Sequence, residues 1–177
     1  MTRCLLILLA LASTASATTT VEVRDGESIQ KAVNEAEPGT TILIYPGTYK
    51  ETVYIDKDGI TLRGVVEEGN WPVLEGEGHR NDAVLYSGNG ITVERLKITH
   101  YKGNGIMGQA GNNFTIRYNW IDDTGVYGIF PEFGKNGLIE YNVLRGIEDA
   151  AIYVGMCDNI DVRHNEVYEN VAGIEIE

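Results

Sequence analysis

Residues 111–133 read GNNFTIRYNWIDDTGVYGIFPEF, and this pattern recurs every 23 residues. The copies begin at Gly88, Gly111, Gly134 and Cys157. Each copy contains three short runs of alternating apolar and other residues, separated by Gly, Asn and Asp, which is typical of short strands joined by turns. No copy has room for a helix of ordinary length. A unit of three strands that closes in 23 residues therefore predicts one coil of a parallel β-helix.

The predicted fold is an all-β, right-handed, single-stranded parallel β-helix of about six coils, in which strands of successive coils pair in register. The hand follows from the rule for parallel crossover connections. Two columns of the repeat support this register. One alternates in charge and is predicted to face outward; the other holds asparagines predicted to form a buried ladder. The charged column is Arg63, Glu94, Arg117, Glu140 and Arg163, and the asparagines are Asn119, Asn142 and Asn165.

Ahead of the repeats, a short amphipathic helix is predicted over about 28–37, with Asp25 or Ser28 as N-cap. We expect it to cover the open end of the first coil. The following strands, Ile42–Ile44 and Val53–Ile55, are predicted to be joined by a turn at Tyr45–Tyr49. Residues 59–64 align with residues 90–94 at a spacing of 31, so that coil carries eight extra residues, assigned to loops at 66–72 and 76–82.

Residues 1–17 have the features of a cleaved signal peptide: a positive Arg3, an apolar run at 4–12 and Ala15-Ser16-Ala17. The apolar run is shorter than the about 20 residues that cross a bilayer, so no membrane span is expected after cleavage. The protein is therefore predicted to be exported, to the periplasm or the extracellular space. Residues 18–177 are predicted to form the β-helix domain.

Without its first 17 residues the chain has a net charge of −13. This disfavours nucleic acid and anionic membranes as partners, and also a uronate polymer unless Ca²⁺ mediates. The remaining cysteine, Cys157, occupies a glycine column and is interpreted as a small buried residue. The last predicted rung ends at Glu177 without a cap. We expect the domain to be C-terminally incomplete, or its open end to be covered by a protein partner.

The segment Ser28–Gly64, which includes TTI, YPGTY and GITLRG, resembles the entry to pectate-lyase-like right-handed β-helix proteins. GVYGIFP at 125–131, DAAIYVG at 149–155 and NVAGIEIE at 170–177 resemble a family of exported bacterial β-helix repeat proteins. That family has no established activity, so the resemblance implies the fold and no reaction. The Asn-Thr-Asp and Gly-His-Gly segments of the related polygalacturonases are absent.

Acidic residues gather at the turn after the second strand of each coil. If successive coils stack, the catalytic candidates are Asp122, Asp123, Glu148 and Asp149, with Arg145 as a lyase base or a counter-ion. Ca²⁺ could bind at Asp122, Asp123 and Asp149, or one carboxyl could have a raised pKa for general acid work. The alternative is a set of solvated acidic turns.

The third strand is predicted to carry an outward apolar stripe, which is the candidate substrate-binding surface. The stripe is Met107, Phe130, Tyr153 and, in approximate register, Tyr86; small residues at 105, 128, 151 and 173 were expected to open a trough beside it. Sugar rings stack their apolar faces on aromatic side chains. The sequence therefore predicts a protein that binds an extracellular polysaccharide and processes it as a lyase, hydrolase or epimerase. The alternatives are ordinary packing for the stripe, and for the protein a non-catalytic periplasmic or surface role through protein partners.

Overall fold

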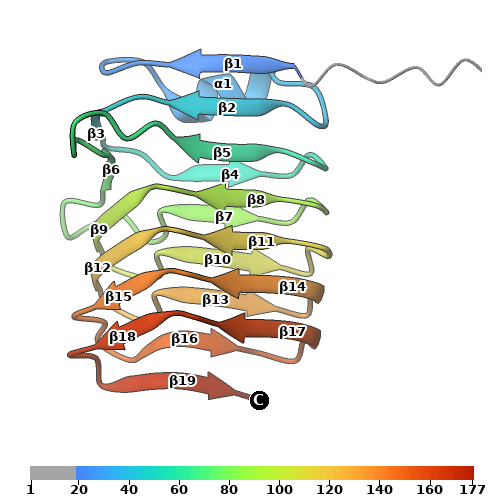
Figure 1. The fold of residues 1–177 in the computed structure, drawn as a ribbon, viewed down its shortest axis with the longest axis vertical. Helices are drawn as coiled ribbons and strands as arrows, with labels where there is room; N and C mark the ends of the chain where they lie inside the picture. The colour runs from blue at the N-terminus through green and yellow to red at the C-terminus, as the bar shows by residue number, and fades with distance from the viewer. Residues whose placement is uncertain (1–18) are drawn as a thin grey trace, which may run out of the picture.

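The computed structural model describes residues 19–177 as a right-handed parallel β-helix of three sheets (Figure 1). Sheet A consists of β1 (Thr20–Val23), β2 (Thr41–Ile44), β5 (Thr61–Gly64), β8 (Thr92–Glu94), β11 (Thr115–Arg117), β14 (Lys135–Glu140) and β17 (Asp158–Arg163). Sheet B consists of β3 (Gly47–Tyr49), β6 (Pro72–Glu75), β9 (Lys97–Tyr101), β12 (Trp120–Thr124), β15 (Val143–Arg145) and β18 (Glu166–Tyr168). Sheet C consists of β4 (Val53–Ile55), β7 (Val84–Tyr86), β10 (Ile106–Gln109), β13 (Ile129–Glu132), β16 (Ala150–Val154) and β19 (Ala172–Ile176). The chain makes about seven turns, since β1 adds a strand to sheet A ahead of the expected coils.

The strand register confirms the repeat. Ile116 pairs with Val93 and Ile139, each 23 residues away. Leu62 pairs with Val93 across the longer coil, at the expected spacing of 31. One local prediction was wrong: Tyr45–Tyr49 is not only a turn, because its last three residues form β3 and pair with β6.

The interior is filled mainly by aliphatic side chains, and an asparagine ladder lines it at the bend between sheets A and B. Asn142 Oδ1 accepts hydrogen bonds from the Nδ2 and the backbone N–H of Asn119, both at 3.0 Å. Asn142 Nδ2 donates to Ile116 O at 2.9 Å and to Asn165 Oδ1 at 3.0 Å. The ladder satisfies buried backbone groups at the bend between sheets A and B, as predicted. In the glycine column, Cys157 is half-buried, and burial raises the pKa of its thiol.

Helix α1 (Ile29–Glu35) covers the first coil and contacts β1, β2 and β4. Ser28 is the N-cap and its side chain accepts a hydrogen bond from Lys31 N at 3.1 Å. The Glu51 carboxylate accepts from the backbone N–H of Ile29 at 2.8 Å, which satisfies a further free donor of the first turn. The predicted apolar face is buried against the coil, so the helix acts as the cap that the sequence indicates.

The alternating charged column is only partly exposed, which corrects the prediction of a fully outward ladder. Glu94 and Glu140 are 2% and 7% exposed, because arginines of the neighbouring strands lie over them. Glu94 accepts hydrogen bonds from Arg63 and, at 2.6 Å, from Arg117. Burial raises the pKa of Glu94, but the two arginines outweigh it and the net pKa is lowered.

The predicted signal peptide lies outside the described residues. Within residues 19–177, no helix is long and apolar enough to cross a membrane. The predictions of an incomplete C-terminal end and of a partner covering it are not tested by the fold.

Candidate functional site

The predicted acidic turn lies at the bend between sheets B and C. Asp122 pairs with Thr99 and Arg145 of the neighbouring strands, so the stacking of this column is confirmed. The residues that follow, His100, Asp123 and Gly146, have φ of +57°, +51° and +67°. This left-handed backbone bends the chain at the same place in successive coils, and pairing resumes between Tyr101 and Thr124.

Asp122 is a structural partner of Arg145. Asp122 is 6% exposed, and its Oδ2 lies 2.8 Å from Arg145 Nη2. The hydrogen bond with Asp122 raises the pKa of Arg145. A guanidinium held in its charged form is a poor proton acceptor, so this geometry favours the counter-ion role over the lyase-base role.

Beside this ion pair lies a shallow depression of about 370 Å³, lined by Gly78, His100, Tyr101, Lys102, Asp123, Gly125, Gly146 and Glu148. His100 Nδ1 lies 3.0 Å from both carboxylate oxygens of Glu75. His100 Nε2 lies 3.7 Å from Asp123 Oδ2. Because a carboxylate can only accept, Nδ1–H donates to Glu75, and this contact turns Nε2 toward Asp123 at the depression.

The four predicted carboxylates do not converge on one point. Glu148 N donates to Thr124 O at 3.0 Å and Asp149 N to Val126 O at 3.1 Å, so both stack beyond Asp122 and Asp123 instead of over them. Glu148 lines the depression, whereas Asp149 does not, and the charge of Asp149 acts on Tyr127. Among residues 19–177 there is no group of three or more acidic, His or Cys side chains placed to hold a metal. The Ca²⁺ site at Asp122, Asp123 and Asp149 therefore stays a prediction from the sequence.

The outward face of sheet C carries the apolar stripe, with one correction. Strand pairing aligns Tyr54, Leu85, Met107 and Phe130 in β4, β7, β10 and β13. The pairing of Ile129 with Ile152 then places Tyr153 of β16 beside Phe130. We call these five residues the sheet C stripe.

Tyr86, predicted to belong to this stripe, points into the core instead. It is 1% exposed, its ring centroid lies 5.6 Å from that of Phe114, and Leu85 takes its place outside. The expected trough was also wrong, because a Cβ at Gly105 or Gly128 would meet core side chains and Ala151 is fully buried.

The lower half of the stripe is an aromatic cluster that includes Tyr127. The Tyr127 ring stacks on Tyr153 at 4.8 Å, and Phe130 meets these two rings edge-on at 4.9 and 5.2 Å. Burial, followed by the charges of Asp149, Glu175 and Glu177, raises the pKa of Tyr127. The hydrogen bond with Glu177 raises the pKa of Tyr153 to about 12. The cluster therefore lies in acidic surroundings.

Three residues of this region were missed from the sequence: Glu75, Tyr54 and Tyr127. Glu75 lies in the coil with the extra eight residues and Tyr54 in the coil before it, where the 23-residue alignment cannot be extended. The alternation in Val53-Tyr54-Ile55 already indicates an outward Tyr54. His100 was placed in the turn but was not chosen as a candidate.

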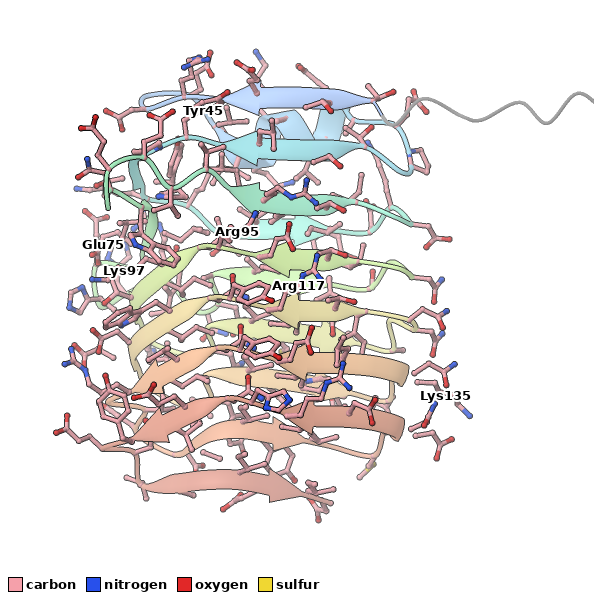
Figure 2. All side chains as sticks on the ribbon, viewed as in Figure 1. Tyr45, Glu75, Arg95, Lys97, Arg117 and Lys135 are labelled. Atoms are coloured by element: carbon pink, nitrogen blue, oxygen red, sulfur yellow. The ribbon has the colours of Figure 1, made fainter. Side chains whose placement is uncertain are left out.

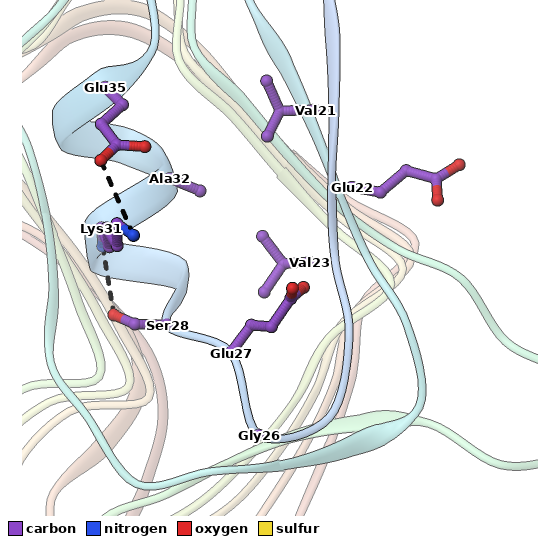
Figure 3. Close-up of a pocket in the computed structure, with 9 residues that line it drawn as sticks. All are labelled: Val21, Glu22, Val23, Gly26, Glu27, Ser28, Lys31, Ala32 and Glu35. Atoms are coloured by element: carbon purple, nitrogen blue, oxygen red, sulfur yellow. Dashed lines mark hydrogen bonds and ion pairs between the residues drawn. The ribbon is translucent and has the colours of Figure 1, made fainter.

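A separate hollow of about 370 Å³ lies at the helix-capped end, between β1 and α1 (Figure 3). Val21, Val23 and Ala32 give it an apolar floor, and Lys31 and Glu35 on its rim form an ion pair at 3.9 Å. None of the predicted site residues lines it.

The three-sheet solenoid makes this chain a right-handed parallel β-helix protein. Residues 51–177 match the family model described as "Right handed beta helix region", and the chain belongs to that family. A search of curated protein sequences gives no significant match.

Solved structures share the fold. An alginate lyase from a Paenibacillus species superposes with a TM-score of 0.64 at 19% identity, over 90% of this chain and 65% of the lyase. The A-module of a mannuronan C-5 epimerase from Azotobacter vinelandii gives 0.52 at 14% identity, over 89% of this chain and 59% of the module. This chain thus spans less than two thirds of either protein. At these identities the likeness shows the fold alone.

Proposed function

We propose that this protein binds an extracellular polysaccharide along the sheet C stripe, in keeping with the predicted export. The observation that carries the proposal is the cluster of Tyr127, Phe130 and Tyr153, whose rings lie within 5.2 Å of one another on an outward sheet face. A flat parallel sheet places such side chains one coil apart, which suits an extended chain of sugar rings.

The charge around the stripe favours a neutral polysaccharide. Asp149, Glu175 and Glu177 act on the tyrosines of the cluster, and no cation is paired with these three carboxylates among the described residues. A polyanion would be repelled there. The alginate lyase and the epimerase, which are named for polysaccharides, support carbohydrate as a general ligand class for this fold.

The double variant Phe130→Ala/Tyr153→Ala tests the stripe. Two lost ring contacts of about 0.5–1.5 kcal/mol each should weaken binding about 10-fold. Affinity electrophoresis in gels that contain galactomannan, xyloglucan or mixed-linkage glucan would measure this. Tyr45→Ala, at the bend between β2 and β3, is the matched control and should behave as the unchanged protein. Absence of retardation by every gel, or equal retardation of the double variant, would count against the proposal.

A second candidate function is proton transfer at the depression, carried by the contact between Glu75 and His100. A carboxylate that accepts from Nδ1–H orients the imidazole and directs Nε2 toward the depression, where it could exchange a proton with a substrate. Asp123 and Glu148 line the same depression and supply carboxylates on its opposite walls. Asp149 follows Glu148 and lies near the aromatic cluster, so a sugar chain on the stripe would reach the depression.

His100→Asn tests the second candidate. Asparagine tolerates the positive φ of this position, so the backbone should be kept while the proton acceptor is lost. We expect turnover of a bound polysaccharide to fall about 100-fold or more, with unchanged retardation in the gels. Release of reducing ends and of unsaturated sugars would be followed. Full activity in His100→Asn, or no turnover of any bound polysaccharide, would exclude this role.

A further inference from the structure

The bend between sheets A and B carries a stacked column of large side chains on the protein surface. The column consists of the residue that follows β8, β11, β14 and β17: Arg95, Tyr118, Tyr141 and His164, with φ of 57°, 57°, 54° and 54°. The rings of Tyr118 and Tyr141 stack at 5.2 Å and 6°, and those of Tyr141 and His164 at 5.0 Å and 14°. We call these four residues the tyrosine ladder.

The tyrosine ladder is exposed and its residue types do not suit its backbone. Tyr118 and Tyr141 are 41% and 44% exposed. Left-handed backbone is unfavourable for most residues, and Gly or Asn avoids much of that cost. The neighbouring bend of the coil uses such residues at positive φ: Gly90, Asn113, Asn136 and Asn159. Ala110, Phe133 and Met156 also take positive φ in successive coils, so what distinguishes this column is the stacking of its exposed rings.

Positive charge gathers at the upper end of the tyrosine ladder. The guanidinium carbons of Arg95 and Arg117 lie 5.9 and 5.8 Å from the Tyr118 ring centroid. Lys97 Nζ lies 5.7 Å from the ring centroid of Trp120 on the adjoining face of sheet B. Figure 2 shows Arg95 and Arg117 beside β8 and β11, on the sheet nearest the viewer.

These cations are not neutralised locally. Arg63 and Arg117 share one carboxylate, Glu94, which leaves one net positive charge. Arg95 and Lys97 form no ion pair within residues 19–177. On a chain with net charge −12, this corner is a local cationic surface next to exposed aromatic rings.

We propose that the tyrosine ladder, with Lys97 and Trp120, is a second glycan-binding surface that takes an anionic polysaccharide. The polymer runs along the solenoid axis, with its carboxylates near Arg95 and Lys97 and its rings against Tyr118 and Tyr141. The surface shares no residue with the sheet C stripe and has the opposite charge, so the two surfaces select different polymers. The assignment therefore stands independently of the function proposed above.

Polygalacturonate and its fully methyl-esterified form test this assignment, because they share one sugar backbone and esterification removes the negative charges. Calorimetric titration should show binding of polygalacturonate that weakens as salt rises, and weaker binding of the ester. Tyr118→Asn/Tyr141→Asn should reduce affinity for polygalacturonate about 10-fold, with an unchanged melting temperature because asparagine suits positive φ. Lys97→Gln/Arg95→Gln should have a similar effect on affinity. The matched control Phe130→Ala/Tyr153→Ala should bind polygalacturonate as the unchanged protein does.

Three results would overturn the assignment. If the protein bound the methyl ester as tightly as polygalacturonate, Arg95 and Lys97 would have no part in recognising the polymer. If Tyr118→Asn/Tyr141→Asn bound polygalacturonate with unchanged affinity, the stacked tyrosines would have only a structural role. Displacement of polygalacturonate by polyglutamate of the same charge, at the same concentration, would make the corner a site for acidic protein segments.

Discussion

Asn142→Ala is expected to lower the free energy of unfolding by about 3–5 kcal/mol, since it leaves several buried polar groups without partners. Asn142 is fully buried and makes four hydrogen bonds. Its removal leaves the backbone N–H of Asn119 without an acceptor, at about 1–3 kcal/mol, and takes the side-chain donor away from the Ile116 carbonyl. The loss of the side-chain contacts with Asn119 and Asn165 adds to this cost.

Urea unfolding followed by circular dichroism would measure this change. Asn136→Ala is the matched control, because Asn136 belongs to an exposed ladder with Asn113 and Asn159. Its loss should cost only about 1–2 kcal/mol, mostly from positive φ at alanine. Equal losses in the two variants would mean that the buried ladder contributes no more than a solvated one.

Gly64→Ala is expected to destabilise the protein by about 3 kcal/mol or to prevent folding, because two coils approach each other too closely for a side chain. A Cβ at Gly64 would overlap the backbone carbonyl oxygen of Arg95 and lie 2.9 Å from Pro72 Cγ. The backbone oxygen cannot move without breaking the bend between sheets A and B.

The melting temperature and the yield of folded Gly64→Ala would show the effect. Gly173→Ala is the control, because a Cβ at Gly173 meets only Val167 Cγ2 at an ordinary 3.8 Å. It should change stability by less than about 0.5 kcal/mol. A Gly64→Ala protein that melts with the control would show that the coils can separate at little cost.

The fold could be predicted because the inward apolar side chains recur at the same 23-residue interval as the coils of the backbone. Ile116, Ile139 and their equivalents recur at 23 residues, and parallel pairing in register requires such a step. The prediction failed where the period breaks. Tyr86 precedes the regular repeats, and an error of one residue moves a side chain from the outer to the inner face.

The candidate site was predicted less well than the fold, since it depends on side-chain partners across coils. The column of Asp122 and Arg145 could be placed from spacing alone, but their mutual ion pair could not. The contact between Glu75 and His100 spans 25 residues, because Glu75 lies in the irregular coil. Asp123 and Asp149, which the repeat places in the same turn of successive coils, do not line one depression.

The buried charged column also limits how the solenoid can change in length. Arg117, Glu140 and Arg163 occupy the same position in three successive coils. The side-chain charge at this position is positive, negative and positive again. The backbone therefore repeats every coil, but the charge repeats every second coil. A duplication or deletion of one coil would bury two glutamates together or stack two arginines, whereas a change of two coils would keep every pair. Growth of this molecule, by evolution or by design, is expected to proceed in even numbers of coils.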